Sequence, residues 1–181
     1  MLASRRTIHE EGVMTGAPFL RAGERAPTIA AQDLDSGASI DLEHLVAGSG
    51  STLFVYWVKT GCPTCRLALP FIDRIARVAP ERVLIVMQDE PDVARDYCDG
   101  ASATTSVVAT EAAPFASADA YGLTNVPTWF EVRADTDGLT VSNSGISFVK
   151  DALEEQFVAV GGEGSLFDAS ERSRLPAMQP G

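Results

Sequence analysis

The chain has few cysteines and few histidines. It contains three cysteines (Cys62, Cys65 and Cys98) and two histidines (His9 and His44) among 181 residues. Three cysteines make one pair and one leftover, which excludes a framework of several disulfides. A structural zinc site needs four ligands, and the remaining cysteine and histidines are scattered without a second paired spacing. The sequence therefore predicts no metal site and no cofactor, and we expect Cys98 to be a buried, inert thiol.

Basic residues and long apolar runs are also scarce. Lys and Arg number 14 against 25 Asp and Glu, so the formal net charge is −11. Nucleic acids and anionic membranes are bound through basic patches, and this charge argues against both as partners. No stretch has the length of a transmembrane helix. Ser4-Arg5-Arg6 begins like a twin-arginine export signal, but polar residues 9–12 follow it where an apolar segment would be needed. We therefore predict a cytoplasmic protein, and the alternative is an exported protein whose targeting segment has been removed.

The most informative motif that is present is Cys62-Pro63-Thr64-Cys65. It follows the apolar run Thr52–Trp57, which has the length of a buried strand, and precedes a stretch with helical spacing of apolar residues. Backbone N–H groups and the macrodipole at the amino end of a helix stabilise a thiolate, so Cys62 is the predicted nucleophile. Cys65 lies one turn further on, where it can attack a mixed disulfide and release the product.

Two prolines and the order of the elements add to this motif. Pro70 lies five residues after Cys65, inside the predicted helix, and Pro127 opens the β-rich run Thr128–Phe130. A proline in this position is a candidate for a cis peptide bond with Val126. The predicted order is strand, C-x-x-C helix, strand, insert, proline-led strand, strand and closing helix. Together these features resemble the thioredoxin-like superfamily, and in particular its TlpA-type and redoxin-domain thiol–disulfide oxidoreductases.

The resemblance implies a fold, an activity and a set of site residues. The fold would be α/β, with a central mixed sheet flanked by helices, an N-terminal extension and an insert before the cis-Pro strand. The activity would be reduction or exchange of protein or small-molecule disulfides, with a thiol as electron donor. Cys62 and Cys65 would be catalytic, Pro63 and Thr64 would tune the redox potential, and the loop at Val126 and Pro127 would face the sulfurs and bind substrate as an added strand.

The chain departs from the family pattern where a proton acceptor for the second cysteine is expected. Thioredoxins carry a buried aspartate on the strand that enters the motif, where this chain has apolar residues 54–56. Many TlpA-type proteins carry a glutamate three residues after the second cysteine, and that position is Ala68 here. Asp89, Glu90 and Glu111 in the insert are candidate substitutes. Gly61 stands where many relatives have tryptophan, which predicts a more open rim around the sulfur.

The chain length suits one domain with extensions at both ends. We expect residues 1–22 to form a mobile leader, residues 23–161 the thioredoxin-like domain, and residues 162–181 a loosely packed tail. Strands are predicted at residues 28–34, 52–57, 83–87, 106–109, 128–133 and 139–141. Helices are predicted at residues 40–46, 65–78, 92–98 and 148–160, with a short one beginning at Phe115.

Two other functions stay open from the sequence. A thiol peroxidase of the peroxiredoxin kind uses a Pro-x-x-x-Thr/Ser-x-x-Cys loop. Counting back from Cys62 gives Lys59 and Val55, and counting back from Cys65 gives Cys62 and Val58, so neither cysteine fits that loop. The second alternative is a non-catalytic, redox-responsive binding module, in which the cysteine pair controls an interaction. The missing proton acceptor favours this alternative.

Overall fold

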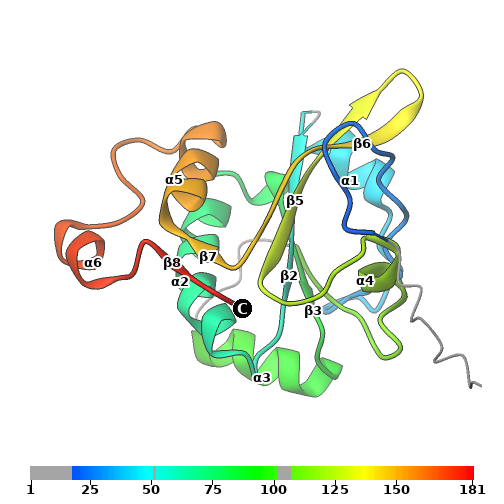
Figure 1. Ribbon diagram of the computed structural model, residues 1–181. Helices are drawn as coiled ribbons and strands as arrows, with labels where there is room; N and C mark the ends of the chain where they lie inside the picture. The colour runs from blue at the N-terminus through cyan, green and yellow to red at the C-terminus, as the bar shows by residue number, and fades with distance from the viewer. Residues whose placement is uncertain (1–17, 51, 102–106) are drawn as a thin grey trace, which may run out of the picture.

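The computed structural model describes residues 18–50, 52–101 and 107–181, and a six-stranded sheet forms its centre. The order of the strands is β1-β4-β3-β2-β5-β6 (Figure 1). Their bounds are Gln32–Asp33 (β1), Thr52–Val58 (β2), Val83–Met87 (β3), Val107–Thr110 (β4), Thr128–Asp135 (β5) and Gly138–Ile146 (β6). The sheet is mixed, as predicted: β2, β3 and β4 are parallel, while β1, β5 and β6 are antiparallel to their neighbours.

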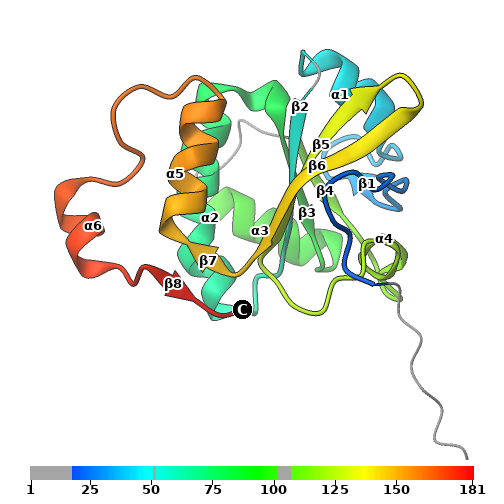
Figure 2. The same ribbon diagram turned by 45° about the horizontal axis from the view of Figure 1, so that its top comes forward.

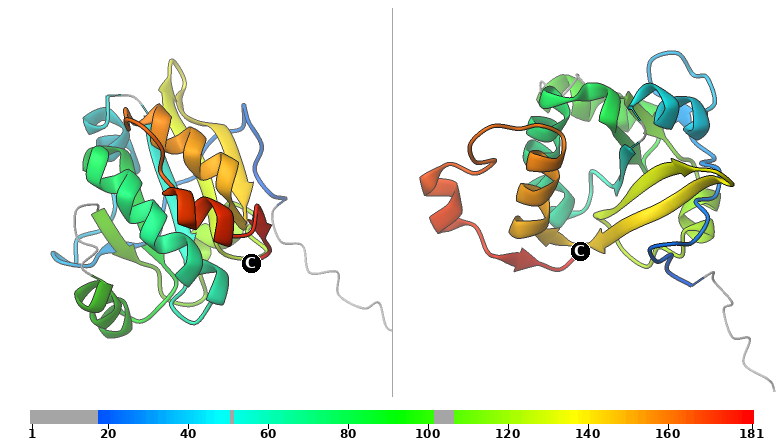
Figure 3. Two further views of the ribbon diagram at one scale, coloured as in Figure 1. Left: turned by 90° about the vertical axis from the view of Figure 1, so that its left-hand side faces the viewer. Right: turned by 90° about the horizontal axis from the view of Figure 1, so that it is seen from above.

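Apart from Thr52, the two central strands, β2 and β3, consist of aliphatic and aromatic residues, which suits strands that helices cover on both faces. One face carries α2 (Pro63–Val78), α3 (Pro91–Ala101) and α5 (Lys150–Ala159), and the other carries α1 (Leu42–Gly48) and α4 (Ala116–Ala120) (Figure 3). Phe54, Tyr56 and Val58 pack toward α2, whereas alternate residues of β2 pack toward α1. This alternation along one strand gives the α/β layers that the sequence predicted.

The insert between β3 and β5 contains α3, β4 and α4, in the predicted order. The predicted strand at residues 106–109 corresponds to β4, and Ser106 lies outside the described residues. Cys98 is on α3 and is buried, with 7% of its surface exposed. Burial raises the pKa of its thiol, which agrees with the expectation of a buried cysteine.

The tail after Gly161 differs from the expected loose packing. Leu166 and Phe167 are buried in the core beside α2, and Phe167 packs against Phe71 with ring centroids 4.5 Å apart. A further helix follows, α6 (Ala169–Arg174), and a two-residue strand, β8 (Met178–Gln179), pairs with β7 (Phe148–Val149). The apolar Leu-Phe pair was too short to show a periodicity, so its anchoring role was not visible in the sequence.

Two polar contacts fix α6. Asp168 and Glu171 form a capping box, and the Glu171 carboxylate forms a bidentate pair with the guanidinium of Arg74 on α2 at 2.7 Å for each bond. From α6 the chain returns toward the amino end of α2, where residue 181 lies (Figure 2). The tail is therefore a packed element that ends beside the cysteine motif.

The expected leader is ordered in its last part. Residues 1–17 lie outside the described residues. Phe19 packs on Phe130 with ring centroids 5.2 Å apart, and the Leu20 N–H donates to the carbonyl of Tyr121. Residues 23–26 then run beside β6, where Gly23 N–H donates to Val141 O and Ala26 N–H to Leu139 O. Residues 18–22 thus belong to the packed domain, because the partly buried Phe19 and Leu20 pack against the core on this face of the sheet.

Candidate active site

Cys62 is placed at the amino end of α2 by the chain leaving β2. A three-residue loop, 59–61, connects the strand to the helix, and Cys62 is the N-cap residue with extended backbone angles. Its Sγ accepts a hydrogen bond from the backbone N–H of Cys65 at 3.4 Å. The side chain is partly exposed, and a Cβ built at the exposed Gly61 would meet no atom within 4 Å. The nucleophile position is therefore a helix terminus with an open rim.

Cys65 lies in the first turn of the same helix and is fully buried. Burial raises the pKa of its thiol to about 12, and the Cys62 side chain and the charge of Asp89 act in the same direction. The backbone N–H of Lys59 donates to Cys65 Sγ at 3.4 Å and opposes this rise. The two sulfurs therefore occupy different environments, one at the surface and one in the core.

The loop at Val126 and Pro127 lies across from Cys62, as the resemblance implied. The peptide bond between these two residues is cis. Pairing of β5 with β2 brings the loop there, because Thr128, the first residue of β5, stands opposite Trp57 near the end of β2. The Cys62 thiol donates to the carbonyl oxygen of Val126 at 3.4 Å. The structure thus brings together residues that are 64 positions apart.

The two residues between the cysteines face different surroundings. Pro63 is exposed at the first position of α2, where its missing N–H costs no helical bond. Thr64 is buried, and its hydroxyl donates to the carbonyl of Pro180 at 2.6 Å. The Gly181 N–H donates to Ser147 Oγ at 3.2 Å. Neither tail contact was predicted from the sequence, because nothing in the composition of the tail marks partners that lie 116 positions away (Thr64–Pro180) and 34 positions away (Ser147–Gly181).

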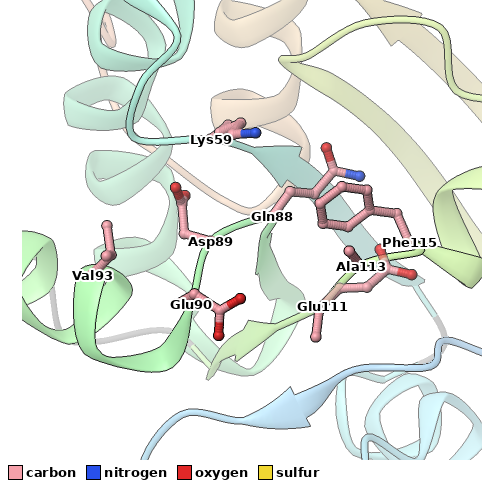
Figure 4. Close-up of a pocket in the computed structure, with 9 residues that line it drawn as sticks. Lys59, Gln88, Asp89, Glu90, Val93, Glu111, Ala113 and Phe115 are labelled. Carbon is pink, nitrogen blue, oxygen red and sulfur yellow. The ribbon is translucent and has the colours of Figure 1, made fainter.

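A small cavity lies at the carboxyl ends of β2, β3 and β4, beside the loop that precedes Cys62 (Figure 4). Its volume is about 270 Å³. The ammonium group of Lys59 lies 5.8 Å from the centre of the Phe115 ring, a cation–π distance. Three acidic residues line the same cavity, and they are the candidate proton acceptors: Asp89, Glu90 and Glu111.

These three acids differ in what they contact. The Asp89 carboxylate accepts from the backbone N–H of Thr60 at 2.8 Å and from its hydroxyl at 2.9 Å, so it is fixed to the loop before Cys62. Glu111 is buried, and its Oε1 accepts from the backbone N–H of Ser117 at 2.6 Å, while no hydrogen bond to Oε2 is found among the described residues. Glu90 is exposed. Asp89 is the one whose charge acts on Cys65.

Strand β2 enters the motif, and among its residues 54–56 only Tyr56 carries a polar group. The Tyr56 hydroxyl donates to Oε1 of Gln156 on α5 at 2.6 Å, and burial raises the pKa of the phenol. Ala68 is also buried. Tyr56 and Gln156 therefore form a buried hydroxyl–amide pair between β2 and α5.

Within the described residues, no group of three or more His, Cys, Asp and Glu side chains is arranged to hold a metal ion. The described helices also include none that is both long enough and apolar enough to cross a membrane.

Comparison with known proteins gives matches among solved structures. No protein-family model matches the sequence, and no curated protein matches it. A candidate thiol:disulfide interchange protein DsbE from Chlorobium tepidum aligns with a TM-score of 0.62 at 22% identity, over 78% of this chain and 98% of that one. The fold is thioredoxin-like.

Two other solved structures with a thioredoxin-like fold align over a similar share of this chain. The thioredoxin domain of a thiol-disulfide oxidoreductase from Bacteroides vulgatus aligns with a TM-score of 0.60 at 17% identity, over 77% of this chain and 97% of that one. A peroxiredoxin-like protein from Aquifex aeolicus aligns with a TM-score of 0.58 at 15% identity, over 80% of this chain and 90% of that one. At these identities the thioredoxin-like fold is shared, and the chemistry must be argued from the site.

Proposed function

We propose that the protein is a thiol–disulfide oxidoreductase that acts on protein or small-molecule disulfides. The observation that carries this proposal is the placement of Cys62 and Cys65 in the first turn of α2, with Cys62 Sγ 3.4 Å from the carbonyl of Val126. A helix terminus favours a thiolate, and a loop with exposed backbone groups beside it can hold an extended substrate. Val126 and Pro127 are the proposed substrate-binding residues.

The reaction proceeds through a mixed disulfide. The Cys62 thiolate attacks one sulfur of the substrate disulfide, the substrate S–S bond breaks, and the leaving sulfur takes a proton. The Cys65 thiolate then attacks Cys62 Sγ, which forms the Cys62–Cys65 disulfide and releases the second substrate thiol. The substrate gains two electrons and two protons, and the protein loses them. A thiol donor reduces the protein again by the reverse sequence.

The second step depends on deprotonation of Cys65. Burial is the main cause of its raised pKa. The contributions of the Cys62 thiol and its charge disappear once Cys62 is bonded to substrate, so the mixed disulfide itself makes Cys65 easier to ionise. Asp89 is proposed as a positioning residue, because it fixes Thr60 and with it the loop whose Lys59 N–H contacts the Cys65 sulfur.

Insulin reduction by dithiothreitol, followed by turbidity, tests the proposal. Cys62→Ser should lose the activity, and Cys65→Ser should form mixed disulfides that persist on a non-reducing gel. Cys98→Ala is the matched control, because this buried cysteine lies outside the motif, and it should keep the activity. Insulin reduction by Cys62→Ser at the rate of the unaltered protein would contradict the proposal.

Two alternatives have their own readouts. Peroxide reduction is favoured by the thioredoxin-like neighbour described as peroxiredoxin-like, and consumption of hydrogen peroxide well above the rate of free cysteine would replace disulfide exchange as the proposed activity. For a redox-responsive binding module, a partner captured equally by the unaltered chain and the Cys62→Ser/Cys65→Ser variant would indicate binding without catalysis. The cytoplasmic location stays a prediction, and cell fractionation would test it.

A further inference from the structure

The last five residues of the chain, Ala177–Gly181, lie on the cysteine motif. The carbonyl of Pro180 accepts a hydrogen bond from Thr64, between the two cysteines, at 2.6 Å. Gly181 is so close to the opposite loop that a Cβ built on it would overlap the carbonyl oxygen of Val126. That carbonyl is also the acceptor of the Cys62 thiol. The segment therefore fills the space between the motif and the loop that faces it.

The segment is held in the way that an extended peptide would be. Its strand β8 pairs antiparallel with β7, and the Lys150 N–H donates to Ala177 O at 2.9 Å. The Gly181 N–H donates to Ser147 Oγ at 3.2 Å, and Ser147 N–H in turn donates to Pro127 O at 2.7 Å. Backbone hydrogen bonds with few side-chain requirements are what strand addition supplies.

The segment is less firmly attached than the rest of the tail. Leu166 and Phe167 anchor the tail in the core, and the Arg74–Glu171 pair anchors α6. Beyond α6 the side chains are largely exposed, including Met178 at 54%, and the β7–β8 ladder is two residues long. Exposed hydrogen bonds and little apolar burial mark segments that open locally while the remainder stays folded. Residues 177–181 can therefore leave the site without unfolding α6.

We propose that Ala177–Gly181 is a tethered occupant of the surface formed by Thr64, Val126 and Ser147, and that it competes there with extended peptides that carry a disulfide. The occupancy is inferred from the contacts above, and the identity of the competing peptide rests on the proposed function. A tethered segment acts at an effective concentration in the millimolar range, so it can occupy this surface even when its affinity is weak. Substrates must then displace it before they reach Cys62.

The test compares the unaltered chain with a chain that ends at Leu175, and with Gly181→Ala in the full chain. The truncated chain loses all segment contacts, and the added methyl group of Gly181→Ala displaces only the end from Val126. Met178→Ala is the matched control, because it removes an exposed side chain and keeps the backbone pairing. Circular dichroism checks folding, and Gly181→Ala decides the question if the truncated chain does not fold.

Two readouts separate this inference from the proposed function. The first is the rate at which iodoacetamide alkylates Cys62, and this reaction needs no oxidoreductase activity. We expect the rate to rise about 3- to 10-fold on truncation, because the site is freed from a competing occupant. Gly181→Ala should give a smaller increase and Met178→Ala none. The second is the KM for insulin, which should fall by a similar factor while kcat changes little.

The outcomes are distinct. If Cys62 in the truncated chain and in Gly181→Ala is alkylated no faster than in the unaltered chain, the proposed occupancy is wrong. This holds whether or not the protein reduces insulin. Faster alkylation without insulin reduction in any variant keeps the occupancy and removes the proposed function. A free peptide of residues 177–181, added at millimolar concentration, should slow alkylation of the truncated chain back toward the rate of the unaltered chain.

Discussion

The two sides of the cysteine motif differ in almost every property that matters for thiol chemistry. On the side of Cys62, the surroundings are backbone carbonyls and N–H groups of the Val126 loop and the tail, with the sulfur partly exposed. On the side of Cys65, the sulfur is buried, and beyond the loop lies a cavity with three acidic residues. Cys62 is therefore the accessible sulfur of the pair, and Cys65 is enclosed in the core.

In the proposed reaction, this difference assigns attack on the substrate disulfide to one thiol and resolution of the mixed disulfide to the other. The attacking thiol needs access and a stabilised thiolate, whereas the resolving thiol must be kept from other disulfides until a mixed disulfide forms next to it. Burial provides that protection at the expense of a raised pKa. Each of the following experiments tests how the surroundings of Cys62 and Cys65 differ.

The largest expected effect is a difference in reactivity between the thiols. With a pKa of about 12 against an ordinary value of 9.0, the thiolate fraction of Cys65 near neutral pH is about 10³-fold below that of an unperturbed thiol. Iodoacetamide at pH 7.5, followed by peptide mass spectrometry, should modify Cys62 and leave Cys65 and Cys98 unmodified. Equal labelling of Cys62 and Cys65 in the folded, reduced protein would show that the two sides do not differ.

The next effect concerns pH. Because the Cys65 pKa is raised, its reactive thiolate increases about tenfold for each pH unit while the pH stays well below that value. A mixed disulfide between Cys62 and thionitrobenzoate, made with the Cys98→Ala variant, should release the coloured thiol with this pH dependence from pH 6 to 9. A rate independent of pH would mean that ionisation of Cys65 does not limit release.

The smallest effect is expected from Asp89→Asn. The substitution weakens two hydrogen bonds to Thr60 and should lower the free energy of unfolding by about 1–2 kcal/mol, measured by urea denaturation. It also removes a charge that raises the pKa of Cys65, so release from the mixed disulfide should become faster at a given pH. Glu90→Gln is the control, since this exposed neighbour lines the same cavity. A slower release in Asp89→Asn would indicate that Asp89 accepts the Cys65 proton.

The sequence predicted the motif and its strand-to-helix position well, because these depend on local patterns. The apolar run at β2, the helical spacing after Cys65 and the proline before β5 each carry a local signal, and parallel pairing of β2 with β3 follows from the helix between them. The Val126 loop was placed opposite Cys62 through the resemblance. The predicted strand at residues 28–34 is shorter in the structure, since β1 comprises Gln32 and Asp33 alone.

The contacts that were missed around the cysteine motif join distant segments through polar atoms. The Thr64–Pro180 bond and the Asp89–Thr60 bonds depend on where the whole fold brings these residues, and serine, threonine and aspartate at these positions are equally suited to solvent. The tail differs from its expected loose packing in a similar way, because two buried residues (Leu166 and Phe167) and the ion pairs Arg74–Glu171 and Arg172–Glu154 fix most of it. The spacing of residues along a chain reveals apolar faces, but it does not reveal which polar side chains form hydrogen bonds or ion pairs with each other.

The segment 23–26 beside β6 has a consequence for how the protein behaves in concentrated solution. An uncovered sheet edge offers unpaired N–H and C=O groups on which another chain can form a strand. Here one edge strand, β1, is two residues long, and at the other edge hydrogen bonds between residues 23–26 and β6 occupy part of the ladder. Removal of residues 18–26 would expose β6, and we expect such a shortened protein to self-associate through that edge.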